Sequence, residues 1–243
     1  MTEIIAHRGG AILWPENSLA AFRNAIAAGA DAVECDVHHS ADGEVMVMHD
    51  PTLERTTNGR GALGERTAAE LAKLRLIGAG GEAVPRLEDL LSLVATGRGG
   101  IQIEVKADWR GRLDTPLLGH VLAALDRHGL RPRTEVIVFE AEVAAAAVAA
   151  GGLRSVAWLF SPAMIRHIGL DGILAVLRRT GAGMVETHES AMDAELLSAF
   201  RGAGLRVGAW GANHAPALRR MLDLGLDAVA TDDPVLAISL RDR

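Results

Sequence analysis

The chain has 243 residues, 49% of them hydrophobic and 23% charged, with a formal net charge of −6 at pH 7. We expect one folded domain over residues 1–243, and the negative charge without a basic cluster argues against a nucleic-acid or anionic-membrane partner. A single cysteine excludes an internal disulfide. We expect no signal peptide and no apolar run of the roughly 18 residues that span a bilayer. The sequence therefore predicts a cytoplasmic protein without a membrane anchor.

Short apolar strands alternate with amphipathic, Ala- and Leu-rich helical segments along the whole chain. Strands are predicted at 3–7, 31–37, 101–106, 134–139, 154–159, 183–188, 206–210 and 227–231. Helices are predicted at 18–28, 67–75, 86–95, 115–128, 141–150, 163–179, 193–203, 214–224 and 234–239. This alternation predicts an α/β fold, a TIM (β/α)8 barrel. An open doubly wound sheet is the rival, and it is disfavoured because no glycine-rich dinucleotide fingerprint follows the first strand.

A further strand-like run at 45–49 follows an Asp-Gly turn signal at 42–43. This pattern predicts a β-hairpin extension after the second strand. If those two residues form the turn, Asp36 faces His49 across the hairpin. The predicted register therefore carries His49 back beside the carboxylates of the second strand.

Carboxylates share one face of two predicted strands. Glu34 and Asp36 alternate with apolar residues in the second strand, and Glu104 and Lys106 do so in the third. In a barrel the apolar face meets the helices, so the charged face points into the lumen near the C-terminal mouth. Repulsion between the carboxylates would raise their pKa values or require a cation, and oxygen ligands favour Mg²⁺ or Ca²⁺. The alternative is an internal salt bridge of Lys106, which supplies one positive charge against three negative ones.

Two histidines and an arginine are predicted at the same mouth. His7 ends the first strand and His49 ends the hairpin, so one could accept a proton while the other donates one. Arg8 offers a fork of donors suited to phosphate, although it could instead pair with Glu16. Together with a cation, these groups predict a site for an anionic phosphodiester.

On these residues the sequence resembles the glycerophosphodiester phosphodiesterase family. The resemblance implies a TIM barrel that cleaves glycerophosphodiesters to glycerol 3-phosphate and an alcohol. Its motifs are spread over the whole chain: His7-Arg8-Gly9, Pro15-Glu16-Asn17-Ser18, Glu34-Cys35-Asp36, His49-Asp50, Thr52 to Gly61, Glu104-Val105-Lys106, Trp210, and Gly225 to Pro234.

The resemblance implies a catalytic centre built on a metal and two histidines. Glu34, Asp36 and Glu104 would hold a divalent cation, for which we favour Mg²⁺ over Ca²⁺. His7 and His49 would be the general acid/base pair. Direct attack by water and a cyclic phosphate intermediate are both compatible with these residues.

The resemblance also implies a set of substrate-binding residues. Arg8 and Lys106 would bind the phosphate, and Trp210 would shape the pocket. Glu16 and Asn17 are expected to position the arginine, the metal or the substrate. The partner would be a small-molecule glycerophosphodiester; the sequence does not specify an oligomeric state.

Two other functions are compatible with the same residues. A lysophospholipase D-type enzyme would act on lysophospholipids, but the sequence shows no amphipathic anchor. A binding protein without turnover is disfavoured because both histidines are present. In the later strands, Glu186 and His188 share one strand face, and Asp232 and Asp233 are not counted as ligands.

Overall fold

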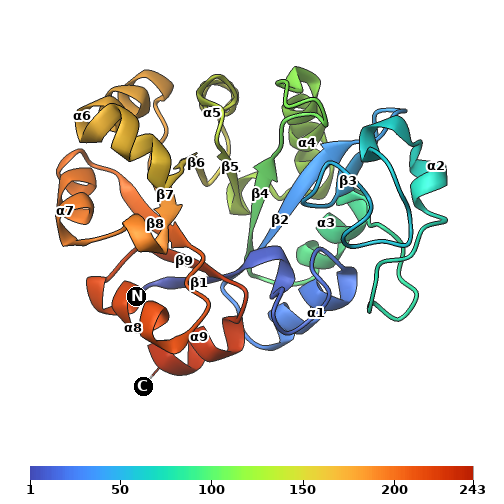
Figure 1. Cartoon of the computed structure of the whole chain (residues 1–243), viewed down its shortest axis with the longest axis horizontal. Coiled ribbons are helices and arrows are strands. Elements are labelled where there is room, and N and C mark those ends of the chain that lie inside the picture. Colours follow the sequence, from blue (N-terminus) through green and yellow to red (C-terminus); the bar gives the residue numbers. More distant parts are fainter. Residues whose placement is uncertain (243) are drawn as a thin grey trace.

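The computed structural model describes residues 1–242 and shows a closed parallel β-barrel (Figure 1). Its strands are β1 (Glu3–Ala6), β2 (Ala32–His39), β4 (Gly100–Val105), β5 (Thr134–Val138), β6 (Ser155–Phe160), β7 (Met184–His188), β8 (Arg206–Trp210) and β9 (Ala228–Thr231). The barrel closes because β1 pairs in parallel with both β2 and β9. The predicted TIM (β/α)8 barrel is confirmed, and the open sheet is excluded.

Helices surround the barrel as a ring (Figure 1). They are α1 (Leu19–Ala27), α3 (Leu87–Ala95), α4 (Thr115–His128), α5 (Ala141–Ala150), α6 (Pro162–Thr180), α7 (Ala194–Gly202), α8 (Ala215–Leu224) and α9 (Pro234–Arg241). Four 3-10 turns accompany them: η1 (His7–Gly9), η2 (Leu63–Glu65), η3 (Arg131–Arg133) and η4 (Glu189–Ala191). No helix within residues 1–242 combines the length and the apolar character needed to cross a membrane.

The helix predicted at 67–75 is shorter than expected, because α2 covers only Ala68–Leu71. Beyond it, the amides of Lys73 and Leu74 bond to carbonyls only three residues back. The Arg75 amide then donates to the Asn58 side chain at 2.8 Å. The chain is therefore diverted into the long segment that precedes α3.

The hairpin after β2 forms, but in a register one residue away from the predicted one. Strand β3 (Val45–Val47) pairs antiparallel with β2, with Val37 opposite Val47. The loop contains three residues, because Gly43 adopts φ +84° and the Ser40 amide donates to the Glu44 carbonyl. Asp36 therefore lies opposite Met48, whose amide donates to the Asp36 carbonyl at 2.9 Å, and His49 follows one position later.

The two faces of the strands separate apolar from charged residues, as predicted. The outward face of β2, with Val33, Cys35 and Val37, is buried in the main core against the helices. The inward face of the same strand carries Glu34 and Asp36, which are also buried. A smaller apolar cluster fills other parts of the lumen: Ile5, Ala32, Ile137, Ala157, Leu159, Met184, Ala228 and Ala230. Glu34, Asp36 and Glu104 thus gather in the part of the lumen formed by β2 and β4.

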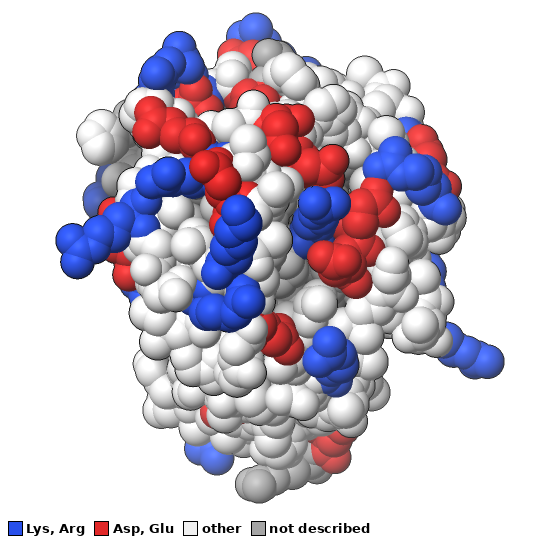
Figure 2. Space-filling model, turned by 90° about the vertical axis from the view of Figure 1, so that its right-hand side faces the viewer, with Lys and Arg blue, Asp and Glu red and all other residues white. Residues whose placement is uncertain are grey.

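The hairpin extension lies beside the barrel, together with α2. Figure 2 shows this side of the molecule, where acidic and basic side chains are interspersed. Charges of one sign do not gather over an extended area of this face. The distribution agrees with the absence of a basic cluster from the sequence.

The chain turns sharply after β1, and this turn sets the position of Arg8. Arg8 has φ +51° and Gly9 has φ +83°, both in the left-handed region. A Cβ on Gly9 would lie 2.8 Å from the Cβ of Ala21 in α1. Gly9 therefore allows the backbone of η1 to contact α1 directly.

We predict that Gly9→Ala lowers the free energy of unfolding by about 2–5 kcal/mol, from left-handed strain together with overpacking. Gly29→Ala is the matched control, because Gly29 has φ +89° but a Cβ added there would meet no atom within 4 Å. It should lose only about 1–2 kcal/mol. Urea denaturation measures both, and equal losses would contradict the proposed contact.

Candidate active site

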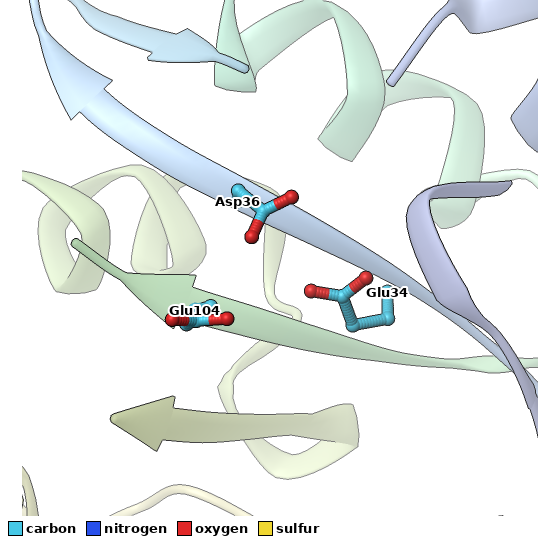
Figure 3. A group of neighbouring side chains, drawn as sticks. All are labelled: Glu34, Asp36 and Glu104. Carbon is cyan, nitrogen blue, oxygen red and sulfur yellow. The ribbon is translucent and has the colours of Figure 1, made fainter. Parts of the chain in front are cut away.

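Three carboxylates meet at the C-terminal mouth of the barrel (Figure 3). Glu34 and Asp36 come from β2, and Glu104 comes from β4, where it is paired in register with Asp36. One oxygen of each carboxylate lies within 4.8 Å of the others. All three side chains are buried. The structure thus brings together the three metal ligands that the sequence predicts.

Burial and mutual repulsion dominate the electrostatics of these acids. Burial, reinforced by Asp36, raises the pKa of Glu34 to about 8. Burial likewise raises the pKa of Glu104 to about 7, against the opposing charge of Lys106. For Asp36 burial is outweighed by Lys106 and Arg8, which lower its pKa. Because the Glu34 Oε1 atom has no hydrogen-bond partner among residues 1–242, these oxygens fit a hard divalent cation.

The basic residues contact the same acids. Lys106 Nζ lies 2.6 Å from Glu104 Oε1 and 3.0 Å from Asp36 Oδ1, which is the salt bridge of the alternative without a metal. Arg8 Nε lies 3.5 Å from Asp36 Oδ2, and Arg8 Nη1 lies 3.3 Å from Glu16 Oε1. One lysine balances only one carboxylate, and none of these contacts involves the unpartnered oxygen of Glu34. A cation therefore remains the better match to the acidic cluster.

The side chain of Asn17 bonds to the acidic cluster at Asp36. Its side-chain amide donates to Asp36 Oδ2 at 2.9 Å, and Asn17 is itself buried. Like Arg8, it adopts a positive φ, of +55°. The expected positioning role of Asn17 is compatible with this contact to Asp36.

His7 lies at the seam where the barrel closes. Its Nδ1–H donates to Asp232 Oδ1 at 2.6 Å, and its Nε2 lies 4.0 Å from Glu34 Oε2. Burial lowers the pKa of His7, but Glu34 and Asp232 outweigh this effect and the pKa is raised. Asp232 is fixed in turn by Asn213, whose Nδ2 donates to it at 2.5 Å. No sequence pattern pairs Asp232 with His7, because the two residues are 225 positions apart.

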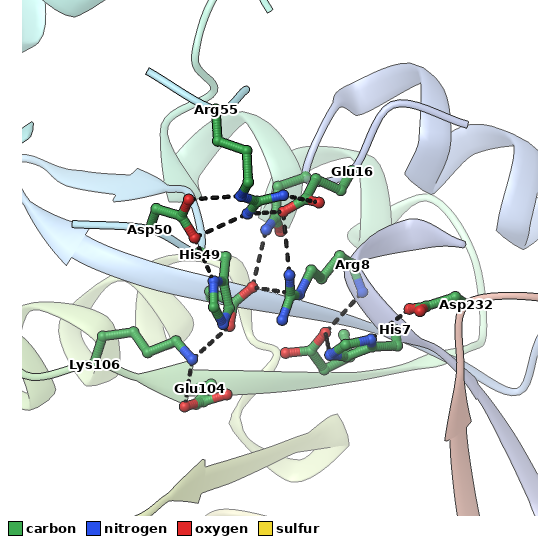
Figure 4. Close-up of polar contacts among 12 residues, drawn as sticks. His7, Arg8, Glu16, His49, Asp50, Arg55, Glu104, Lys106 and Asp232 are labelled. Atoms are coloured by element: carbon green, nitrogen blue, oxygen red, sulfur yellow. Dashed lines mark hydrogen bonds and ion pairs between the residues drawn. The ribbon is translucent and has the colours of Figure 1, made fainter. Parts of the chain in front are cut away.

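His49 has a comparable carboxylate partner but the opposite pKa shift. Its Nδ1–H donates to Asp50 Oδ1 at 2.7 Å. Burial lowers the pKa of His49, and the positive charges of Lys106 and Arg8 add to this effect. Asp50 also accepts hydrogen bonds from Arg55, a residue of the Thr52 to Gly61 motif for which the sequence predicts no role. Figure 4 shows this network around both histidines.

A cavity of about 120 Å³ opens onto these groups. One side is polar and is formed by His7, Arg8, Glu34, His49, Glu104 and Lys106. The other side comes from strands β5 to β9 and the residues that follow them, and consists of Ile137, Phe139, Leu159, Glu186, Trp210 and Ala230. Of the other predicted site residues, Glu16 and Asn17 contact Arg8 and Asp36 from outside the cavity, as described above.

Two polar groups stand out on the mainly apolar side. Glu186 is 1% exposed, and its Oε1 accepts a hydrogen bond from Gln102 Nε2 at 2.8 Å. Burial, reinforced by Glu135, raises the pKa of Glu186 to about 7. The indole N–H of Trp210 is buried without a hydrogen-bond partner among the described residues. Both groups are thus available to a polar ligand in the cavity.

Gly208 and His188 help to place Glu186 and Trp210 on this side of the cavity. A Cβ on Gly208 would lie 2.8 Å from Glu186 Cγ, so only glycine leaves space for the glutamate. His188 packs edge-on against Trp210, with ring centroids 4.7 Å apart, and its Nδ1 contacts Ser190 Oγ at 2.8 Å. His188 therefore supports the tryptophan and is not a lining residue.

Comparisons with known proteins agree on one family. A model of the glycerophosphoryl diester phosphodiesterase family matches residues 7–236. A glycerophosphodiester phosphodiesterase of Caldanaerobacter subterraneus subsp. tengcongensis is 30% identical, with 98% of this chain and 97% of that protein covered. The crystal structure of an Agrobacterium tumefaciens protein, 30% identical, has a TM-score of 0.96 and covers 100% of this chain and 98% of that one. A phosphodiesterase of Oleispira antarctica, solved in complex with the product sn-glycerol-3-phosphate, is 25% identical, with a TM-score of 0.86 and coverage of 100% and 98%.

We predict that Asp232→Asn lowers the pKa of His7, because the substitution removes a negative charge from the Nδ1–H. Histidine NMR titration of the metal-free protein measures this pKa. Asp193→Asn is the control, since Asp193 only caps α7. An unchanged His7 titration in Asp232→Asn would contradict the assigned coupling.

Proposed function

Because this chain belongs to the glycerophosphoryl diester phosphodiesterase family and is a hydrolase of that class, we propose that it hydrolyses small glycerophosphodiesters to glycerol 3-phosphate and an alcohol at the mouth of the barrel. The observation that carries the proposal is the cavity itself. It has a volume of about 120 Å³, and buried carboxylates, two histidines, an arginine and a lysine line one side of it. The Oleispira relative, which was solved with sn-glycerol-3-phosphate, supports the same product.

We propose that Glu34, Asp36 and Glu104 hold a divalent cation, with Mg²⁺ favoured over Ca²⁺. The raised pKa values of Glu34 and Glu104 support this, because a bound cation would keep both groups ionised. When bound, the cation would neutralise negative charge on the phosphoryl oxygens. The proposal of Mg²⁺ depends on the cytoplasmic location, which stays a prediction from the sequence.

Arg8 and Lys106 are the proposed phosphate-binding residues. Both line the cavity, and both lie against the acids that would hold the cation. A phosphodiester anion would compete with Glu16 for the Arg8 guanidinium, which is a fork suited to two phosphate oxygens. Glu16 therefore keeps Arg8 in place before the substrate arrives.

The two histidines are proposed to divide proton transfer between them. His49, with its lowered pKa, is neutral near pH 7 and suits the general base that takes a proton from the attacking hydroxyl. His7, with its raised pKa, binds a proton more strongly than an ordinary histidine and suits the general acid that protonates the leaving alkoxide. In each ring the carboxylate on Nδ1 leaves Nε2 as the reacting nitrogen.

We propose that the opposite side of the cavity recognises the glycerol group. Glu186 can accept a hydrogen bond from a glycerol hydroxyl, and the unpartnered indole N–H of Trp210 can donate one. The apolar side chains of Phe139 and Leu159 in this wall suit the carbon chain of glycerol.

Release of glycerol 3-phosphate from a panel of glycerophosphodiesters tests the reaction. We expect EDTA to abolish release, because the reaction is proposed to need the cation held by the three carboxylates. Mg²⁺, the favoured cation, should restore release more fully than Ca²⁺. Glu104→Gln should reduce activity and weaken the response to added Mg²⁺. Full activity in EDTA would refute metal dependence, whereas headgroup release from lysophosphatidylcholine alone would favour the lysophospholipase D-type alternative.

For the glycerol side of the cavity, we expect Glu186→Gln to lower kcat/KM for glycerophosphodiesters by about 10-fold, because the amide replaces one acceptor oxygen by a donor nitrogen and removes the charge that the carboxylate can carry. Bis(p-nitrophenyl) phosphate carries no glycerol, so its hydrolysis should change far less. The exposed substitution Glu142→Gln is the control. Equal losses on both substrates would argue against recognition of glycerol by Glu186.

A further inference from the structure

Arg55 lies between two carboxylates that come from different loops of the mouth (Figure 4). Towards Glu16 it donates from Nη1 to Oε2 at 2.7 Å and from Nη2 to Oε1 at 2.8 Å. Towards Asp50 it donates from Nε to Oδ2 at 2.6 Å and from Nη2 to Oδ1 at 2.9 Å. One guanidinium thus makes two bidentate contacts, the strongest geometry available to an arginine–carboxylate pair.

Each of these carboxylates also holds one residue of the active site. Glu16 Oε1 accepts a hydrogen bond from Arg8 Nη1 at 3.3 Å. Asp50 Oδ1 accepts one from His49 Nδ1 at 2.7 Å. Arg55 therefore connects the loop that carries Arg8 with the loop that carries His49, although it does not line the cavity itself.

We propose that Arg55 is a positioning residue for the hydrolysis, one that fixes the phosphate-binding Arg8 and the general base His49 relative to each other through Glu16 and Asp50. The proposal rests on the proposed function of this site. An exposed ion pair contributes little to folding stability. The side chain of Arg55 is 47% exposed, so its main effect is expected on geometry and proton affinity.

The charge of Arg55 also controls how strongly Asp50 acts on His49. Hydrogen bonds from Arg55 are the main reason that the pKa of Asp50 falls to about 2. Without Arg55, the full negative charge of Asp50 would act on the His49 ring and raise its pKa. The other charged groups facing His49 are Asp36 from β2, Lys106 after β4 and Arg8 from η1, and all three are still present in such a variant.

Loss of Arg55 should affect substrate binding by a second route. Glu16 contacts both Arg8 and Arg55, and without Arg55 it would keep only Arg8 of these two partners. It would then compete more strongly with the phosphate for the Arg8 guanidinium. KM should then rise. The combined effect separates a positioning role from simple stabilisation of a loop, which would alter neither the pH profile nor KM in folded protein.

The experiment compares the full-length wild type with Arg55→Ala, Arg55→Lys and the control Arg127→Ala. Arg127 of α4 pairs with Glu88 of α3 and bonds neither Glu16 nor Asp50. We expect Arg55→Ala to lower kcat/KM by about 10–100-fold, to raise KM and to shift the acidic limb of the pH profile to higher pH. Arg55→Lys keeps the charge but not the two forks, so it should keep the wild-type acidic limb and recover only part of kcat/KM.

Histidine NMR titration provides a readout independent of turnover, in which the pKa of His49 should be higher in Arg55→Ala than in the wild type and the control. A wild-type His49 titration in folded Arg55→Ala, or an unchanged kcat/KM and pH profile, would overturn the proposal. If the wild type releases no glycerol 3-phosphate at all, the proposed function fails. In that event the NMR result still decides whether Arg55 controls His49.

Discussion

Buried like charge is the constraint on which the rest of the site depends. The parallel register of β2 and β4 places Asp36 beside Glu104, and Glu34 lies one lumen position earlier on the same strand. These side chains are buried, so burial and mutual repulsion raise the pKa of Glu34, while nearby cationic groups offset part of the negative charge. Lys106, Arg8 and Asn17 all contact Asp36, which makes this aspartate the centre of the network.

The surrounding groups shift the pKa values of two otherwise similar histidines in opposite directions. Each imidazole donates Nδ1–H to an aspartate, so hydrogen bonding alone gives them the same tautomer. The difference comes from their neighbours: His7 lies near the buried acid Glu34, and His49 lies near Lys106 and Arg8. The opposite pKa shifts of the two rings suit the acid–base roles proposed for them.

The sequence predicted the barrel and the acidic sector of its lumen because strand alternation is a local signal. Glu34, Asp36 and Glu104 could be placed on the inward face from period-two patterns alone. The hairpin register was wrong by one residue because it depends on the left-handed backbone at Gly43, which an Asp-Gly pair permits without specifying the loop length. The functions of the residues and the choice of Mg²⁺ stay predictions, as does the extent of the domain.

Other features had no local signal. Asp232 contacts His7 only because β9 pairs with β1. Arg55 bonds two carboxylates that lie in separate loops. Glu186 was noticed as a charge on a strand, but its place in the cavity depends on the absence of a side chain at Gly208. Barrel closure, loop packing and the pairing of neighbouring strands produce these contacts, and residue patterns in one strand do not encode them.

The seam between β1 and β9 has a consequence for how the enzyme is made. A ribosome synthesises His7 near the start of the chain and Asp232 more than two hundred residues later. The three carboxylates, His49 and Arg55 are all translated before Asp232, which accepts the hydrogen bond from His7 Nδ1. During synthesis the proposed general base therefore has its carboxylate partner Asp50 as a chain neighbour, whereas His7 gains Asp232 only after β9 has emerged.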